Sequence, residues 1–449
     1  MTYSSVSPTT NLNDRYLGLL SGVLLGYALL GKGFAYIGLP PLFAGEITLL
    51  FGLVVSLRTK CLLASFTTFP SLVLAATMCW VLARTLPFVG VYGFDALRDS
   101  VVIMYGVFAF IMISLLVEDD RRVIAIIQYY GIFANSFVIA IPFVFLIQRF
   151  MADYIPNVPG TNIPILWVSP GELNVHLTGA VVFVLVGFRR ISTTWIVCLI
   201  VALVLACASS RAAILAFILP VTFAVLMLGK VRQLAMALVA GLAIFAAAYA
   251  VETSLTTYQE ATYSEERSLS AHQIVDNFSS ILGKSNEQAA GTETWRLDWW
   301  KIIINDTLFG PDFWSGRGFG LNLAVADGFE DGAHPELPTL RSPHNVNMTI
   351  LARGGVPGIV LWLLFVGSWL CVVIHAMLTA RHHGRTEWAA LFLFTACYAA
   401  SFVINASFDV ALEGPVQGIW FWCVVGFGIG SVLVFRCQPT EVPASCEYE

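Results

Sequence analysis

Residues 123–147 read VIAIIQYYGIFANSFVIAIPFVFLI, a stretch of the chain without a single charged side chain. A helix needs about 20 apolar residues to cross the hydrocarbon core of a membrane. The stretch is continuously apolar and lacks the alternation that a strand of an outer-membrane barrel shows. We therefore predict a membrane-spanning helix here, and eleven further apolar stretches predict the same: 16–31, 39–57, 61–83, 100–117, 172–188, 191–207, 212–228, 233–251, 348–376, 387–405 and 415–435.

The composition of the whole chain agrees with this prediction. Of its 449 residues 57% are hydrophobic and 12% are charged, and the mean hydropathy is +0.78. This small number of polar residues cannot cover the core of a soluble protein. We therefore predict an all-α polytopic membrane protein of about 12 transmembrane helices. No small-residue cleavage site follows the polar residues 1–14, so no removable signal peptide is expected. A net charge of -5 gives no reason to expect nucleic acid as a partner.

Basic residues predict how the helices are oriented. They fall on alternate short loops, and cytoplasmic loops carry the excess of lysine and arginine. Both termini are then cytoplasmic, and the long polar segment 252–347 is an exported loop between helices 1–9 (residues 1–251) and helices 10–12 with a cytoplasmic tail (348–449). The residues that support this orientation are Arg15, Arg58, Lys60, Arg121, Arg122, Arg189, Arg190, Lys230, Arg232, Arg381, Arg385 and Arg436.

Cysteine and histidine patterns predict no metal site. None of the nine cysteines lies in segment 252–347, so packing on the helices must order that segment. The chain has neither a CxxC nor an HExxH motif, and we expect no cofactor. His334, near Glu330 and Asp331, is the one weak suggestion of a metal ligand, and no second ligand cluster accompanies it.

Charged side chains avoid the middle of every predicted helix and gather at the exported ends. Charge within a bilayer is costly and usually functional, so its absence there argues against a proton-coupled transporter. Any chemistry should therefore face outward. The gathered residues are Arg84, Asp95, Arg98, Asp99, Glu172, His176, Arg211, Arg353, Asp409 and Glu413.

Arg211 lies in an unusual place. In CASSRAAILAF the serines are good N-caps, so Arg211 falls in the first turn of a helix, where the helix dipole disfavours a cation. A phosphate or pyrophosphate bound by free backbone N–H groups and by the guanidinium would offset the repulsion between Arg211 and the helix dipole. The alternative is an arginine that reaches up to lipid headgroups.

The exported loop contains a second arginine of interest. Residues 292–306, TETWRLDWWKIIIND, predict an amphipathic helix with Trp295, Trp299, Ile302 and Ile303 on one face. Arg296 is not on the polar face. If the helix lies on the membrane with its tryptophans down, Arg296 points toward the protein or toward a lipid headgroup.

His344 and Asn345 stand at the start of the tenth predicted helix. Asn345 is a good N-cap, so the pair has a purely structural interpretation, while imidazole also suits a general base near neutral pH. Glu172 and His176, at i and i+4, either line a cleft or form a packing hydrogen bond. Asp409 and Glu413 are candidates for orienting His344 or an arginine.

Taken together these motifs resemble a known family. The order is Ser210–Arg211, Arg296 with Trp299, the glycines Gly316, Gly318 and Gly320, then Pro343–His344–Asn345 and GGVPG at 354–358. This pattern over roughly residues 195–430 resembles the O-antigen ligase superfamily, and DALRDS at 95–100 is similar to a further stretch typical of it. The superfamily includes O-antigen ligases, polymerases of the same architecture and bacterial protein O-oligosaccharyltransferases.

The resemblance implies a metal-independent, GT-C-like glycosyltransferase at the periplasmic face of the inner membrane. Its donor would be a glycan on undecaprenyl pyrophosphate, and its acceptor lipid A-core or another glycan. Residues that match Arg211 and Arg296 would hold the pyrophosphate, and His344 would act on the acceptor hydroxyl. Further substrate contacts are predicted from Asn345, Arg98, Arg84, Glu172 and His176.

Three functions remain open on the sequence alone. The single long loop between the ninth and tenth predicted helices favours an O-antigen ligase over a polymerase, which would share the donor site. A transporter of lipid-linked sugars belongs to another class and would need ionisable groups at mid-membrane depth or related halves, neither of which is found.

Overall fold

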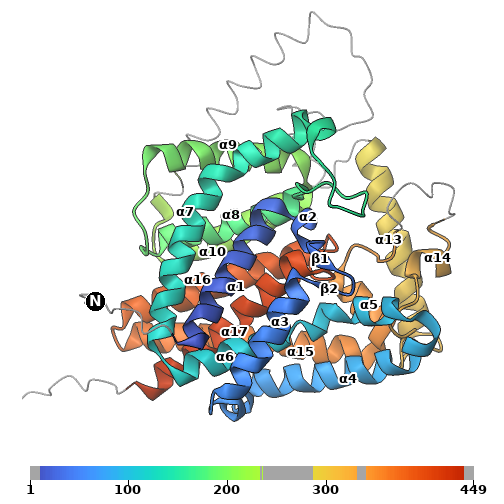
Figure 1. Cartoon of the computed structure of the whole chain (residues 1–449), viewed down its shortest axis with the longest axis horizontal. Coiled ribbons are helices and arrows are strands. Elements are labelled where there is room, and N and C mark those ends of the chain that lie inside the picture. Colours follow the sequence, from blue (N-terminus) through green and yellow to red (C-terminus); the bar gives the residue numbers. More distant parts are fainter. Residues whose placement is uncertain (1–10, 233–234, 236–286, 331–339, 439–449) are drawn as a thin grey trace, which may run out of the picture.

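The computed structural model describes residues 11–232, 235, 287–330 and 340–438 (Figure 1). Apart from a hairpin of two short strands, each two residues long, the regular elements described there are helical. The helices are α1 (Leu12–Leu30), α2 (Lys32–Ala35), α3 (Ala44–Arg58), η1 (Leu62–Phe66), α4 (Phe69–Tyr92), α5 (Phe94–Met104), α6 (Val107–Glu118), α7 (Arg121–Phe150), η2 (Ala152–Tyr154), α8 (Pro170–Leu185), α9 (Thr193–Ser209), α10 (Arg211–Met227), α13 (Glu287–Leu308), α14 (Leu323–Ala326), α15 (Val346–His382), α16 (Thr386–Ala406) and α17 (Pro415–Cys437). The antiparallel strands are β1 (Gly38–Leu39) and β2 (Leu42–Phe43).

The prediction of an all-α membrane protein is confirmed as a class. Five of the described helices, α4, α7, α15, α16 and α17, are long and apolar enough to cross a membrane. The bent pair α5 and α6 makes a sixth if it forms one span, and α8, α9 and α10 are apolar but shorter. The described residues thus support five or six spans by length and composition, and the predicted run 233–251 lies outside them except for residue 235.

Three predicted helix bounds were wrong. The run 39–57 becomes helical only at Ala44, because Pro40 and Pro41 occupy the hairpin turn. The run 61–83 begins with η1, and α4 starts after the N-cap Thr68 and continues to Tyr92. The run 100–117 is not one helix but a pair, α5 and α6, that bends by 40°. The bend separates the charged helix α5 from the apolar and almost wholly buried helix α6.

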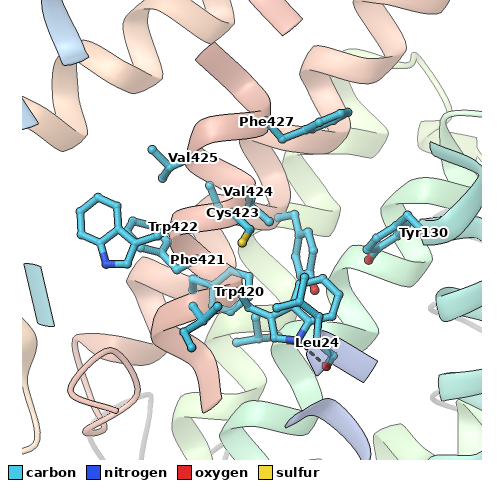
Figure 2. Packing of buried hydrophobic residues seen from close by; sticks show 14 of the residues in the cluster. Leu24, Tyr130, Trp420, Phe421, Trp422, Cys423, Val424, Val425 and Phe427 are labelled. Atoms are coloured by element: carbon cyan, nitrogen blue, oxygen red, sulfur yellow. Dashed lines mark hydrogen bonds between the residues drawn. The ribbon is translucent and has the colours of Figure 1, made fainter. Parts of the chain in front are cut away.

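Helix α17 forms the centre of the bundle, and most of its side chains are buried (Figures 1 and 2). Glycines allow it to approach α6: a Cβ at Gly426 would lie 2.5 Å from the carbonyl oxygen of Ala109. Close approach through small residues is the usual way in which helices associate within a bilayer. The indole Nε1 of Trp420 donates to the Leu24 carbonyl at 2.8 Å, which ties α17 to α1.

A charge cluster closes the end of the bundle where α17 finishes. Arg122 is 4% exposed and lies 2.9 Å from Asp14 and 2.6 Å from Glu118. Asn13 also donates to Glu118, at 2.6 Å. The cluster therefore joins α1, α6 and α7, and its buried arginine has partners for its charge.

Helix α15 is broken at Gly355, whose φ of 68° is not helical, and the segment 313–318 fills the break. Backbone N–H groups of Arg317 and Gly318 donate to the carbonyls of Ala352 and Arg353 at 2.8 and 3.0 Å. The N–H of Val356 donates to Phe313 at 2.8 Å. The two glycine-rich motifs of the sequence are therefore partners, and together they satisfy backbone groups that the break exposes.

Gly316 offers a direct test of this packing. Alanine there should destabilise the fold by more than the roughly 1 kcal/mol that a left-handed backbone costs a non-glycine residue. Its Cβ would lie 2.5 Å from the carbonyl oxygen of Arg353, and its φ is 58°. Gly328→Ala is the matched control, since Gly328 has φ 76° and open space around its Cβ. Thermal unfolding in detergent should show a clearly larger loss for Gly316→Ala; equal losses would mean that the close approach contributes nothing.

The predicted amphipathic helix is present as α13, although its apolar face meets protein. Trp299 and Ile303 are fully buried against Leu323, Ala324 and α15. The Trp299 indole also donates to Asp327 at 2.6 Å. The expected position with this tryptophan in lipid was therefore wrong, because the segment 321–329 and α15 supply a covering surface that periodicity alone does not reveal.

Candidate active site

The segment 340–345 is held in place by contacts along its whole length. Leu340 N–H donates to Glu330 at 3.1 Å, and the Pro343 carbonyl accepts from the Trp300 indole at 2.9 Å. Asn345 caps α15 by accepting from the N–H groups of Asn347 and Met348. The backbone that carries His344 is therefore held firmly on both sides of this residue.

Arg341 connects the segment to a larger charge cluster. Its guanidinium lies 3.2 Å from Asp95 and 3.1 Å from Asp99, and it donates to the Gly320 carbonyl at 2.9 Å. Arg353, only 1% exposed, lies 3.0 Å from the same Asp99. Neither arginine was given a role from the sequence. A usable signal was present, because Asp95 and Asp99 at i and i+4 on one helix face require cationic partners.

His344 itself has an uncommon backbone conformation. Its φ is 54°, the single positive value at a residue other than glycine within the described residues. Such conformations cost about 1–3 kcal/mol and persist where the surroundings enforce them, often at functional sites. The imidazole Nδ1 lies 3.6 Å from Asp409 Oδ1, and the ring stands edge-on to Trp295 at 6.1 Å. Both side chains of the His344–Asp409 pair are about 30% exposed, at 27% and 32%.

The loop between α16 and α17, residues 407–414, brings Arg296 to this pair. Arg296 Nη1 donates to the Phe408 carbonyl at 3.0 Å, one residue before Asp409. Burial alone raises the pKa of Asp409, but the nearby His344 imidazole, the Val410 N–H and the charge of Arg296 outweigh it and lower that pKa below its ordinary value. Asp409 is therefore an anion at neutral pH beside the imidazole and the guanidinium. Predicted residues Arg296 and His344 do come together.

Glu172 lies close to the same loop. It forms a capping box with Ser169 at the start of α8. It lines a cavity of about 70 Å³ together with Lys32, Trp167, Ser169, Asp409, Val410 and Ala411. Lys32, which stands over the Trp167 ring at 4.8 Å, was not recognised in the sequence. Asp409 thus faces His344 and this cavity at once.

Arg211 lies at the same end of the bundle, in the first turn of α10. Ser210 caps the helix by accepting from the Ala213 N–H, as predicted. Ser401 of α16 donates to the Ala216 carbonyl at 2.7 Å, which aligns the start of α10 with the end of α16. Arg211 therefore stands where α16 leads into the 407–414 loop.

The remaining predicted residues bind other parts of the protein. Arg98 lies 3.1 Å from Asp95 and 3.2 Å from Asp99, and its side chain is 42% exposed. Arg84 donates to the Gly316 carbonyl at 3.4 Å and stands over Phe88. His176 is buried among aromatic rings and forms a 2.7 Å hydrogen bond with Tyr398, which fits the packing interpretation. His334 and Asp331 lie outside the described residues, within which no group of three or more His, Cys, Asp or Glu is placed to hold a metal.

Comparison with known proteins adds one finding. The sequence model of a family described as O-antigen ligase matches residues 175–363. The matched range includes Arg211, Arg296 and His344, and it ends before Asp409. No curated protein matches the chain. The predicted resemblance is thereby confirmed.

Proposed function

Because residues 175–363 match the model of a family described as O-antigen ligase, we propose that the chain is an O-antigen ligase that transfers a glycan from undecaprenyl pyrophosphate to lipid A-core. The coarser description, a membrane enzyme of the O-antigen ligase and polymerase type, follows from the family and from the apolar helices. The proposal adds a GT-C-like architecture, an inner-membrane location and a site that faces the periplasm. The observation that carries it is the meeting of His344, Asp409 and Arg296 at one loop.

The proposed chemistry uses these three side chains and Arg211. With Nδ1 turned toward Asp409, the other imidazole nitrogen, Nε2, is left for the acceptor hydroxyl. His344 takes the hydroxyl proton as the acceptor oxygen forms its bond to the anomeric carbon, and the bond from that carbon to the pyrophosphate oxygen breaks. The lipid pyrophosphate leaves with the bonding electrons. Guanidinium groups of Arg296 and Arg211 stabilise its growing negative charge without a metal.

The defining experiment is deletion of the gene followed by analysis of the surface glycan and of the lipid-linked pool. Lipid A-core without O-antigen, with undecaprenyl-linked polymer accumulating, supports ligation. Single repeat units on the core indicate the polymerase instead. An unchanged surface glycan would contradict both.

Asp409→Asn should lower the transfer rate by about 10- to 1,000-fold, because it removes the anion that holds the protonated imidazole. A transfer rate equal to that of the wild type would show that Asp409 does not act on His344.

The same pair has a predictable effect on stability. Since the folded pKa of Asp409 is depressed, its stabilising contribution is complete above the ordinary aspartate pKa of about 3.9. That contribution is lost as the pH falls through the lower folded pKa. The free energy of unfolding of the wild type should therefore fall more steeply below about pH 4 than that of Asp409→Asn.

A further inference from the structure

Glu413 joins the two segments that form the His344–Asp409 pair. Its Oε1 accepts from the Ser342 hydroxyl at 2.9 Å and from the Thr349 hydroxyl at 2.8 Å. These two donors stand on either side of His344 in the sequence, one before the cap of α15 and one within its first turn. One carboxylate oxygen of Glu413 therefore links Ser342 and Thr349, which flank His344 in the sequence.

The same glutamate belongs to the loop that carries Asp409. The loop is short and is bounded by the end of α16 at Ala406 and the start of α17 at Pro415. A displacement of Glu413 therefore displaces Asp409 relative to His344. Because His344 holds an unfavourable φ of 54°, its position depends on restraints from both sides.

We propose that Glu413 is a positioning residue, which sets the separation and orientation of His344 and Asp409 by accepting hydrogen bonds from Ser342 and Thr349. In the proposed mechanism Glu413 touches neither the substrate nor the reacting atoms. The expected effect of Glu413 on the transfer rate rests on the proposed function, whereas its expected effect on the position of His344 does not. The experiment below separates the two.

The surroundings of Glu413 explain why glutamine is a suitable substitute. Burial raises its pKa, although the Thr349 hydroxyl, the charge of Arg353 and the Ser342 hydroxyl each act to lower it. An uncharged amide keeps an oxygen that accepts both hydroxyl hydrogen bonds. Glu413→Gln should preserve the positioning role, and Glu413→Ala should remove it.

Labelling His344 measures the geometry without any substrate. Diethyl pyrocarbonate modifies the imidazole, and trypsin releases residues 342–353 as a peptide in which His344 is the single histidine. The exposed pair His382 and His383, on the peptide 382–385, provides the internal reference. We expect the labelling rate of His344 to change at least threefold in Glu413→Ala and in the Ser342→Ala/Thr349→Ala double variant. It should remain within 1.5-fold of wild type in Glu413→Gln.

Transfer assays in membrane vesicles, with the native lipid-linked glycan and a titrated acceptor lipid, supply the second readout. Glu413→Ala should reduce kcat at least tenfold and leave KM within twofold, while Glu413→Gln should recover kcat to within threefold of wild type. Glu118→Ala is the matched control: Glu118 also accepts from two side chains, but at the opposite end of the bundle. It should alter thermal stability and neither His344 labelling nor kcat.

The outcomes separate the two hypotheses. An unchanged labelling rate in Glu413→Ala, or a failure of glutamine to restore it, overturns the positioning role. Altered labelling in Glu413→Ala that glutamine restores, together with no glycan transfer by the wild-type protein, supports positioning and contradicts the proposed function.

Discussion

Replacing His344 with alanine is expected to lower glycan transfer by about 100- to 10,000-fold, the contribution that a positioned general base makes to a reaction. The acceptor hydroxyl then lacks a base, while the guanidinium groups still bind the donor. The measurement is the amount of surface glycan in a gene-deletion strain that expresses the variant, with the lipid-linked pool measured in parallel. Transfer should fall and the lipid-linked pool should rise.

Two controls separate this chemical effect from a structural one. Membrane abundance of His344→Ala should match that of the wild type, because the side chain is partly exposed and Asn345, not His344, caps α15. Glycine adopts a φ of 54° without steric strain, so His344→Gly offers a second variant. It should be at least as stable as His344→Ala and equally inactive. Normal transfer by either variant would end the catalytic assignment.

Arg296→Lys is expected to reduce transfer by about 10- to 1,000-fold, comparable with the loss of one preorganised group that stabilises developing charge. Lysine keeps the positive charge but lacks the planar fork that donates to the Phe408 carbonyl and to a pyrophosphate together. Arg211→Lys should show a similar loss for the same reason. The assay is the rate of transfer at saturating donor in vesicles.

Helix α13 itself offers a matched control for the arginine. Lys301 lies on the polar face of this helix and pairs with Asp298 at 2.9 Å, with its side chain 71% exposed. Exposed pairs of this kind contribute about 0–1 kcal/mol, so Lys301→Ala should leave transfer and stability nearly unchanged. If Arg296→Lys behaves like Lys301→Ala, the guanidinium has no part in binding the leaving group.

The parts of the fold that the sequence predicts are those that depend on local composition. The run 123–147 is apolar over enough residues to require a long helix wherever it packs, and α7 is that helix. The bend between α5 and α6 has no such local cause. It places the charged residues of α5 beside Arg341 and Arg353, which are distant in the sequence. A hydropathy average over 100–117 cannot include those partners.

The candidate site divides in the same way. Residue type and position relative to predicted helix ends made Arg296, His344 and Asp409 candidates, and the family resemblance supplied the expected roles of the first two. The pairing of the last two was not determined, because hydropathy does not say which loops meet. Periodicity likewise placed Trp299 on an apolar face but could not tell lipid from protein as its cover. The glycine motifs contributed to the family resemblance, yet gave no sign that residues 313–318 would fill the gap in α15.

That interrupted helix constrains how new specificities can be engineered. A chimera that takes the long loop from one relative and the following helix from another would separate three donor–acceptor pairs of the main chain, those of Arg317, Gly318 and Val356. Grafts should therefore exchange residues 313 through 356 as a single cassette. Recombination between related genes faces the same restriction, so crossovers that survive are expected on either side of this interval.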